Sequence, residues 1–186
     1  MRFFVRVAAA VTATVFVGTL VGCTPDDGFH DAPPDGTPSP AASSVFSTKD
    51  DARRAATLAY TKYLAATDKI AQSGGKNPER LAELVTDEWL KTEQASAEEF
   101  RDKDLHTSGS VAVTEFTIQS FDNNVVAYSC LDISGTSVRD ASGKDVTPRN
   151  QPTVLPLEIA FQVKSVSPVV LVVAGSQPWS GQNFCA

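Results

Sequence analysis

Leu157-Glu158-Ile159-Ala160-Phe161-Gln162-Val163-Lys164 is a stretch of alternating apolar and polar side chains. Successive side chains of a strand point to opposite faces, so a period of two predicts a strand with one buried face. The buried face would carry Leu157, Ile159, Phe161 and Val163. Pro156 should lie at the start of this strand or on an edge, because proline cannot donate a hydrogen bond to a neighbouring strand.

Further strands are predicted on both sides of this one. Before it, one face of a strand would carry Ala112, Thr114, Phe116 and Ile118, with a bulge or the strand end near Ser120. A turn at 122–124 leads to a second strand, 125–133. The polar stretch 134–152 predicts an extended hairpin arm. The near-continuous apolar run 169–174 is typical of a strand that is covered on both faces, and the tail 179–185 would pack back on the sheet.

Helices are predicted ahead of the strands. Thr48 and Asp51 form a capping box that opens a helix, and Gly74-Gly75 ends it. Asn77-Pro78 predicts the start of a second helix, Thr86 caps a continuation, and Ser96 opens a further capping box before the helical half ends near Asp104. Helices followed by antiparallel strands predict one α+β domain over 48–186, with the N-terminal helices packed on a curved antiparallel sheet.

The N-terminus has the zones of an export signal. Arg2 and Arg6 precede an uncharged, mostly apolar run, 7–21, which is too short to span a membrane. The sequence Leu20-Val21-Gly22-Cys23 resembles the lipobox of bacterial lipoproteins. That resemblance implies cleavage of the signal peptide 1–22 and attachment of a diacylglyceryl group, with acyl chains such as palmitate, to Cys23. The alternative is a secreted protein with a chance cysteine after its signal.

If the signal peptide is removed, the mature chain begins with a linker and carries a more negative net charge. The stretch 23–47 would be the lipidated cysteine plus a disordered linker, because it is rich in Pro, Gly, Ser, Asp and Ala. Removal of Arg2 and Arg6 lowers the formal net charge of −6 by two, to −8. This balance argues against nucleic-acid binding and against a basic membrane-binding patch. We therefore expect the protein to reach the outer face of the cell membrane through lipid on Cys23.

Two cysteines remain once Cys23 is assigned to lipid. An exported chain resides where disulfides persist, so Cys130 and Cys185 are predicted to pair. Two buried free thiols are the alternative. A metal site is less favoured, because only His30 and His106 could join the cysteines, and no cofactor is predicted.

The Ala-rich first helix with Tyr60 and Tyr63, the short second helix before Trp89 and the strand meander resemble the nuclear transport factor two-like superfamily. This superfamily includes SnoaL-type and ketosteroid isomerase-type domains. The resemblance implies a cone-like domain, favours homodimers, and is shared by many lipid-anchored actinobacterial proteins. Ketosteroid isomerase-type enzymes use an acid as base beside Tyr donors in an apolar cone. Here the candidate pocket-lining residues are Tyr60, Tyr63, Asp68 and Trp89.

Two functions are compatible with these patterns. No catalytic motif is present, so the first is a non-enzymatic protein-interaction module at the cell envelope, with envelope proteins as partners. The alternative is binding of a small apolar ligand, or isomerase-like chemistry, inside the cone. A structure separates the two, since a cone filled by its own side chains leaves no room for a ligand.

Overall fold

The structure is a computed structural model in which Ala42–Ala186 form one compact unit, and it describes residues 45–122 and 124–185. The predicted signal peptide, Cys23 and the linker up to residue 44 lie outside the described residues. The chain is an α+β protein in which the helices precede an antiparallel sheet, as the sequence predicts. Phe46 already packs in the core, two residues before Thr48.

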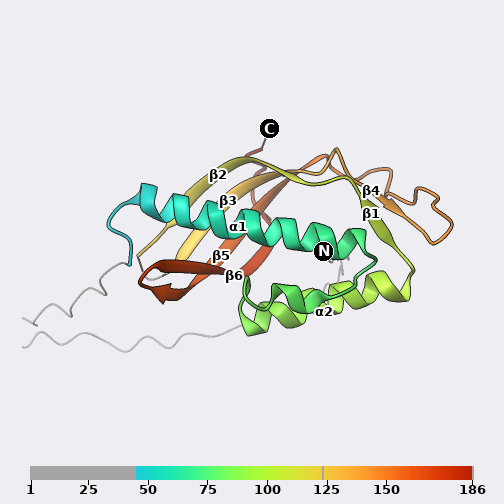
Figure 1. Ribbon diagram of the computed structural model, residues 1–186. Coiled ribbons are helices and arrows are strands. Elements are labelled where there is room, and N and C mark those ends of the chain that lie inside the picture. Colours follow the sequence, from blue (N-terminus) through green and yellow to red (C-terminus); the bar gives the residue numbers. More distant parts are fainter. Residues whose placement is uncertain (1–44, 123, 186) are drawn as a thin grey trace, which may run out of the picture. The chain divides into compact units, whose positions relative to one another are not determined.

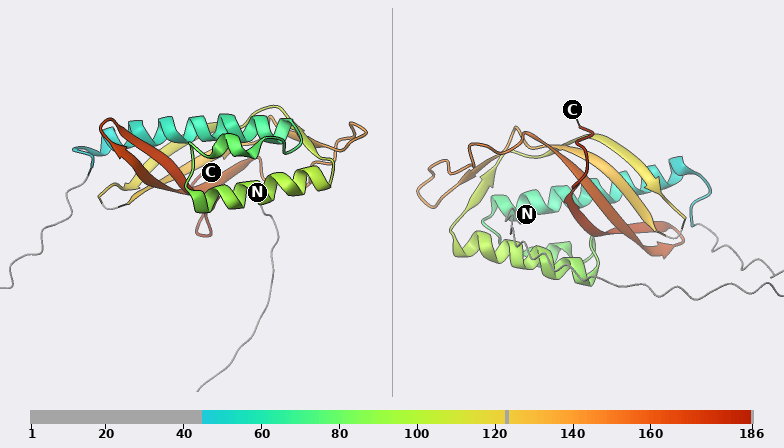
Figure 2. Two further views of the ribbon diagram at one scale, coloured as in Figure 1. Left: turned by 60° about the horizontal axis from the view of Figure 1, so that its bottom comes forward. Right: turned by 180° about the vertical axis from the view of Figure 1, so that it is seen from behind.

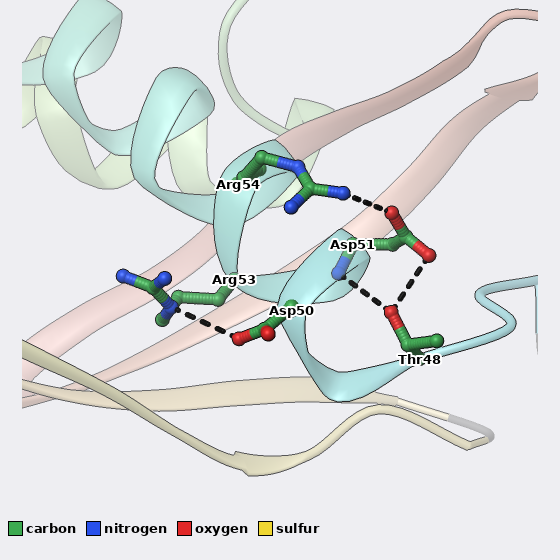
Figure 3. Close-up of polar contacts among 5 residues, drawn as sticks. All are labelled: Thr48, Asp50, Asp51, Arg53 and Arg54. Carbon is green, nitrogen blue, oxygen red and sulfur yellow. Dashed lines mark hydrogen bonds and ion pairs between the residues drawn. The ribbon is translucent and has the colours of Figure 1, made fainter.

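Helix α1, Lys49–Gln72, begins where the capping box predicts (Figure 3). The Thr48 hydroxyl accepts a hydrogen bond from the Asp51 backbone N–H at 3.1 Å and donates to the Asp51 carboxylate at 2.7 Å. The helix ends before Gly74 and Gly75, whose φ angles are +71° and +76°. Position 75 needs glycine for two reasons: its backbone has a positive φ, and a Cβ atom there would lie 2.0 Å from the Ala97 carbonyl oxygen.

The next helical segment differs from the prediction. Asn77 has a left-handed backbone (φ 57°) and makes no side-chain cap, so Asn77-Pro78 opens only a single 3₁₀ turn, η1, Pro78–Leu81. Thr86 does cap helix α2, Asp87–Asp102, by accepting from the Trp89 N–H at 3.3 Å. Ser96 starts no new helix, since it lies inside α2 and its hydroxyl donates to the Thr92 carbonyl at 3.1 Å.

Four antiparallel strands form the main sheet in the order β2-β3-β5-β6. Their bounds are Ala112–Ser120, Val125–Asp132, Val154–Val166 and Val169–Pro178. Strand β5 has the predicted alternation, with Leu157, Ile159 and Phe161 buried. Pro156 is its third residue. The predicted run in β6 is also confirmed at its centre, where three consecutive residues, Leu171 to Val173, are buried.

The facing of β2 is partly wrong in the sequence prediction. A register shift between Val113 and Glu115 places Val113, Phe116 and Ile118 on the core side, while Ala112 and Thr114 are exposed. One extra residue in a strand reverses the facing of everything before it. The second predicted irregularity is present, as a register shift between Ile118 and Ser120 at the end of the strand.

A small second sheet pairs β1, His106–Ser108, with β4, Ser137–Arg139. Sequence analysis missed β1. Beyond β4 the predicted arm turns at Asp140, whose carboxylate accepts from the backbone N–H groups of Ser142 and Lys144. The chain returns with the Val146 N–H donating to the Val138 carbonyl at 2.8 Å. Figure 1 shows this arm at the end of the domain away from the start of α1.

Helix α1 covers one face of the main sheet, and α2 lies on the same side (Figures 1 and 2). The buried residues of α1 are three alanines, two tyrosines and two aliphatic residues: Ala52, Ala56, Ala59, Tyr60, Tyr63, Leu64 and Ile70. The free edge of strand β6 forms hydrogen bonds with the segment before α2. The Val173 N–H donates to the Leu84 carbonyl and the Thr86 N–H donates to the Val173 carbonyl, both at 2.9 Å. No helix among the described residues combines the length and apolar character needed to cross a membrane.

The opposite face of the sheet is crossed by the C-terminal tail (Figure 2, right). Cys130 in β3 and Cys185 in the tail form a disulfide, as the cysteine count predicts. Trp179 N–H donates to the Pro156 carbonyl at 2.8 Å and fixes the start of this tail. The tail therefore packs back on the sheet.

Candidate functional site

The space between α1 and the sheet is filled by aromatic rings. Tyr60 lies 5.7 Å from Tyr63, 6.0 Å from Phe116 and 6.5 Å from Phe161, measured between ring centroids. The Phe161 ring meets Tyr60 edge-on, an arrangement that aromatic quadrupoles favour. These contacts come from one helix and two strands, so the rings form a packed core.

The tyrosine hydroxyls of this cluster have polar partners within it. Tyr63 donates to the Glu93 carboxylate at 2.7 Å, and the Trp89 indole N–H donates to the Tyr63 oxygen at 3.4 Å. The Tyr60 hydroxyl lies 3.2 Å from the Ser176 hydroxyl. Burial raises the pKa of Tyr60 to about 12 and raises that of Tyr63 as well, with the Glu93 charge adding to the shift at Tyr63. Both tyrosines therefore remain neutral hydrogen-bonding groups at neutral pH.

Asp68 lies apart from these aromatics. Its carboxylate accepts from the Val111 backbone N–H at 3.4 Å, beside the chain that leads into β2. Partial burial raises the pKa of Asp68, while its hydrogen bonds to Val111 and Ser110 act in the opposite direction. Of the four residues predicted to line a pocket, the structure brings together Tyr60, Tyr63 and Trp89, and places Asp68 at a different surface.

Glu93 is the acid that the sequence analysis missed. It follows Trp89 by four residues, so both side chains project from the same face of α2. That spacing is the signal the sequence offers, because Trp89 is one of the predicted pocket-lining residues. Glu93 is half-buried and accepts from Tyr63, which makes it the acceptor at the end of a Trp–Tyr–Glu chain.

Two shallow depressions in the described part of the chain lie away from this cluster. One runs along the outside of α2 and is lined by polar residues that include Lys91, Glu98 and Arg101. The other lies between the first turns of α1 and the start of β6, and its lining includes Phe46, Leu58 and Val169. No group of acidic, histidine or cysteine side chains in residues 45–122 and 124–185 is arranged to hold a metal ion.

A second aromatic group lies on the sheet face opposite α1. The Tyr128 ring stacks on Phe184 at 5.3 Å with an interplanar angle of 18°, and contacts Trp179 at 4.7 Å. All three side chains are half-buried. We call Tyr128, Trp179 and Phe184 the aromatic surface. Tyr128 precedes Cys130 by two residues and shares its strand face, so a disulfide from Cys130 draws the tail across Tyr128.

A polar pair borders the aromatic surface. Tyr128 is paired in register with Glu158, which is paired with Gln177 on the next strand. The Gln177 side-chain amide donates to the Glu158 carboxylate at 3.4 Å. Paired residues of adjacent strands project to the same face, so a row of aromatic, acidic and amide side chains crosses this side of the sheet.

Comparison with known proteins gives little further information. No protein-family model matches the sequence, and no curated protein matches it. The crystal structure of the intermembrane space region of the chloroplast protein ARC6 aligns with a TM-score of 0.49 at 14% identity, over 69% of this chain and 97% of that one. A de novo β-sheet design protein aligns with a TM-score of 0.36 at 16% identity, over 74% and 98%.

Proposed function

We propose that this chain is a lipid-anchored protein of the outer face of the cell membrane, and that its α+β domain binds a protein partner of the cell envelope. The anchor is supported by the charged and apolar N-terminal segment and by the lipobox-like Leu20-Val21-Gly22-Cys23. The resemblance to nuclear transport factor two-like domains belongs to the same proposal. It is supported by the order of helices and strands and by one helix covering one face of an antiparallel sheet.

The observation that carries the interaction role is the aromatic surface. Its three rings are only partly buried and contact one another. Tyr, Trp and Phe are enriched in protein interfaces because they contribute large contact areas from side chains with few rotatable bonds. Half-buried aromatic rings on a helix-free sheet face therefore suit a protein-binding surface.

The disulfide makes this surface rigid before any partner arrives. Cys185 follows Phe184 directly and is bonded to Cys130 in the central part of the sheet. Gly181 allows the tail to turn against Trp179, since a Cβ atom there would lie 2.4 Å from the indole nitrogen. A surface that is ordered in the free protein loses less entropy on binding, and this raises affinity.

The alternative of a small apolar ligand between helices and sheet finds no supporting observation. Tyr60, Tyr63, Phe116 and Phe161 occupy that space, and the depressions lie on the outside of the described domain. Asp68, the acid considered for isomerase-like chemistry, faces Val111 rather than these rings. We therefore do not propose this function.

The test has two parts that use the full chain in the cells that produce it. Metabolic labelling with palmitate should mark the parent chain and leave a Cys23→Ser chain unlabelled. In the second part, in-cell crosslinking with the lipidated parent, followed by purification, should retain a defined envelope protein. Trp179→Ala and Phe184→Ala should each reduce that capture about tenfold or more, as alanine substitution of interface aromatics does.

Val146→Ala is the matched control, because Val146 is exposed and lies on the arm, where its N–H pairs with the Val138 carbonyl, and it is not part of the aromatic surface. It should leave capture unchanged. Thermal melting of each variant separates loss of binding from loss of folding. Equal capture by the parent, Trp179→Ala and Phe184→Ala would reject the aromatic surface as the binding site, and a chain without palmitate would reject the anchor.

A further inference from the structure

The hairpin that joins β5 to β6 has an apolar tip. Its residues, Val166-Ser167-Pro168-Val169-Val170, include no charge, and Val166 and Val170 are 67% and 40% exposed. Val166 pairs with Val169, so these two side chains share a face, while Val170 projects to the other face. A hairpin that is apolar on both faces suits immersion in an apolar medium better than docking on a flat surface.

The tip is continuous with a groove at the start of α1. Val169 lines this groove together with Val45, Phe46, Ala55 and Leu58, and the polar side chains of Ser47, Asp51 and Arg54 complete its lining. Leu58 is 58% exposed and Val45 is 37% exposed. We call Val45, Leu58, Val166, Val169 and Val170 the tip patch. Of the five large apolar side chains that are exposed in the described residues, four belong to it. Clustering of this kind marks an interaction site rather than scattered surface residues.

The position of the tip patch in the chain identifies its partner. Val45, the first described residue, is part of the patch, so the segment leading back to Cys23 is joined to the domain at this point. Figure 1 shows the β5–β6 hairpin at the same end of the domain as the start of α1. Cys23 precedes Val45 by 22 residues, and a chain of that length spans at most about 75 Å. A lipid on Cys23 would keep the patch close to the membrane.

Three of the cations near the patch have carboxylate partners within the protein. Arg53 pairs with Asp50 and Arg54 with Asp51 on the first turns of α1 (Figure 3). At the base of the hairpin, Lys164 pairs with Glu83. Because these three cations are shared with carboxylates, we expect contact to come mainly from apolar insertion, which depends little on lipid charge.

We propose that the tip patch inserts into the outer leaflet of the membrane that holds the lipid anchor, and this rests on the anchor in the proposed function. One lipidated cysteine and one inserted hairpin together fix the orientation of the domain. Trp179 is bonded to Pro156 at the start of β5, whereas Val166 is at its end. Ten residues of strand span about 30 Å. The inserted domain would thus hold the aromatic surface away from the membrane, where an envelope protein can reach it.

The test is hydrogen–deuterium exchange on the lipidated chain in phosphatidylcholine vesicles, with the Cys23→Ser chain in solution as the reference. Intact mass first establishes that the lipid is present. Amides of 166–170 should exchange about tenfold more slowly in vesicles, because burial of Val166 and Val170 favours insertion by about that factor. Amides of the arm, 140–146, should exchange equally in both samples. Vesicles with added phosphatidylglycerol should give the same protection.

Aspartate variants of the lipidated chain complete the test. Val166→Asp with Val170→Asp should abolish the protection of the tip. Val146→Asp should preserve it, since Val146 is 40% exposed, as is Val170, but belongs to the arm. Unprotected tip amides in a chain shown to carry lipid would overturn the inference without affecting the anchor. Protection that rises with protein density in the vesicles would assign the patch to a second copy, and protection only with envelope extract would assign it to a protein partner.

Discussion

Removal of the Cys130–Cys185 disulfide should destabilise the domain without changing its fold. The bond closes a chain segment with a sequence separation of 55 residues. It restricts the unfolded ensemble, and for a loop of this length the chain-entropy relation gives about 4 kcal/mol of stabilisation. We choose Cys130→Ala with Cys185→Ala, because Cys130 is buried and a serine there would add an unpaired hydroxyl to the core.

The effect should be large relative to the total stability. Single domains unfold with a free energy of about 5–15 kcal/mol, so a loss of about 4 kcal/mol is a substantial fraction. With a urea slope of about 2 kcal/mol per molar, the midpoint of unfolding should fall by about 2 M. In the native variant the tail can also detach locally, which would expose the Tyr128 ring that Trp179 and Phe184 now contact.

Equilibrium urea unfolding followed by circular dichroism and by tryptophan fluorescence measures both effects. Circular dichroism reports the sheet and helices, whereas tryptophan fluorescence reports Trp89 beside α1 and Trp179 in the tail, and a Trp89→Phe background isolates the tail signal. All chains carry Cys23→Ser, so that no third thiol interferes. The two single-alanine variants should match the double variant within about 0.5 kcal/mol, because each removes the same bond.

A double variant that unfolds within about 1 kcal/mol of its parent would refute the reasoning. It would mean either that the bond is absent from the protein or that the unfolded chain is already as restricted without it. Thiol titration of the denatured parent separates these causes, since a formed disulfide leaves no reactive cysteine.

Two further predictions concern α1. Gly75→Ala should lower the unfolding free energy by more than about 2 kcal/mol, because it combines a positive φ with a Cβ only 2.0 Å from the Ala97 carbonyl oxygen. Gly143→Ala is the control, since Gly143 has a φ of +81° but no atom within 4 Å of the added Cβ. It should lower the unfolding free energy by about 1 kcal/mol in the same urea assay. Burial raises the pKa of Asp68, so the folded protein holds this proton more tightly than the unfolded chain does. Ionisation of Asp68 therefore lowers the free energy of unfolding. This loss of stability is absent below the ordinary pKa of the group and complete above the raised pKa. Asp68→Asn should therefore melt above the parent at pH 7, with the difference vanishing towards pH 3; a difference that does not change with pH would contradict the assigned burial.

The parts of the fold that sequence predicts correctly are those set by local chemistry. Thr48 and Thr86 both cap helices through their hydroxyls. The alternation in β5 reports burial directly, since one face of that strand packs under α1. The disulfide prediction follows from the number of cysteines and from the export that the N-terminal sequence predicts. Each of these signals is contained in a few neighbouring residues or in a count, so no tertiary information was needed.

The errors occur where tertiary context overrides a local signal. Asn77-Pro78 has the composition of a helix start, yet Asn77 takes a left-handed conformation and only one turn of 3₁₀ helix follows. Ser96 satisfies its hydroxyl on the Thr92 carbonyl and remains inside α2. In β2 the extra residue near Thr114 is not visible in the sequence. Ala112 and Thr114 continue the period of two set by Phe116 and Ile118, so the pattern gives no sign that Val113 is the residue that faces the core.

The separation of Asp68 from the tyrosines follows from helix geometry. Consecutive residues of an α-helix are about 100° apart around the axis and rise 1.5 Å, so Asp68 lies about 140° around and about 7.5 Å along from Tyr63. Two side chains so placed cannot face one cavity. The spacing from Trp89 places Glu93 on the same face of α2, but only the packing of α1 against α2 shows that this face meets Tyr63. An acid inside the cluster thus depends on helix packing, and here that acid accepts a hydrogen bond from the Tyr63 hydroxyl within the packed cluster.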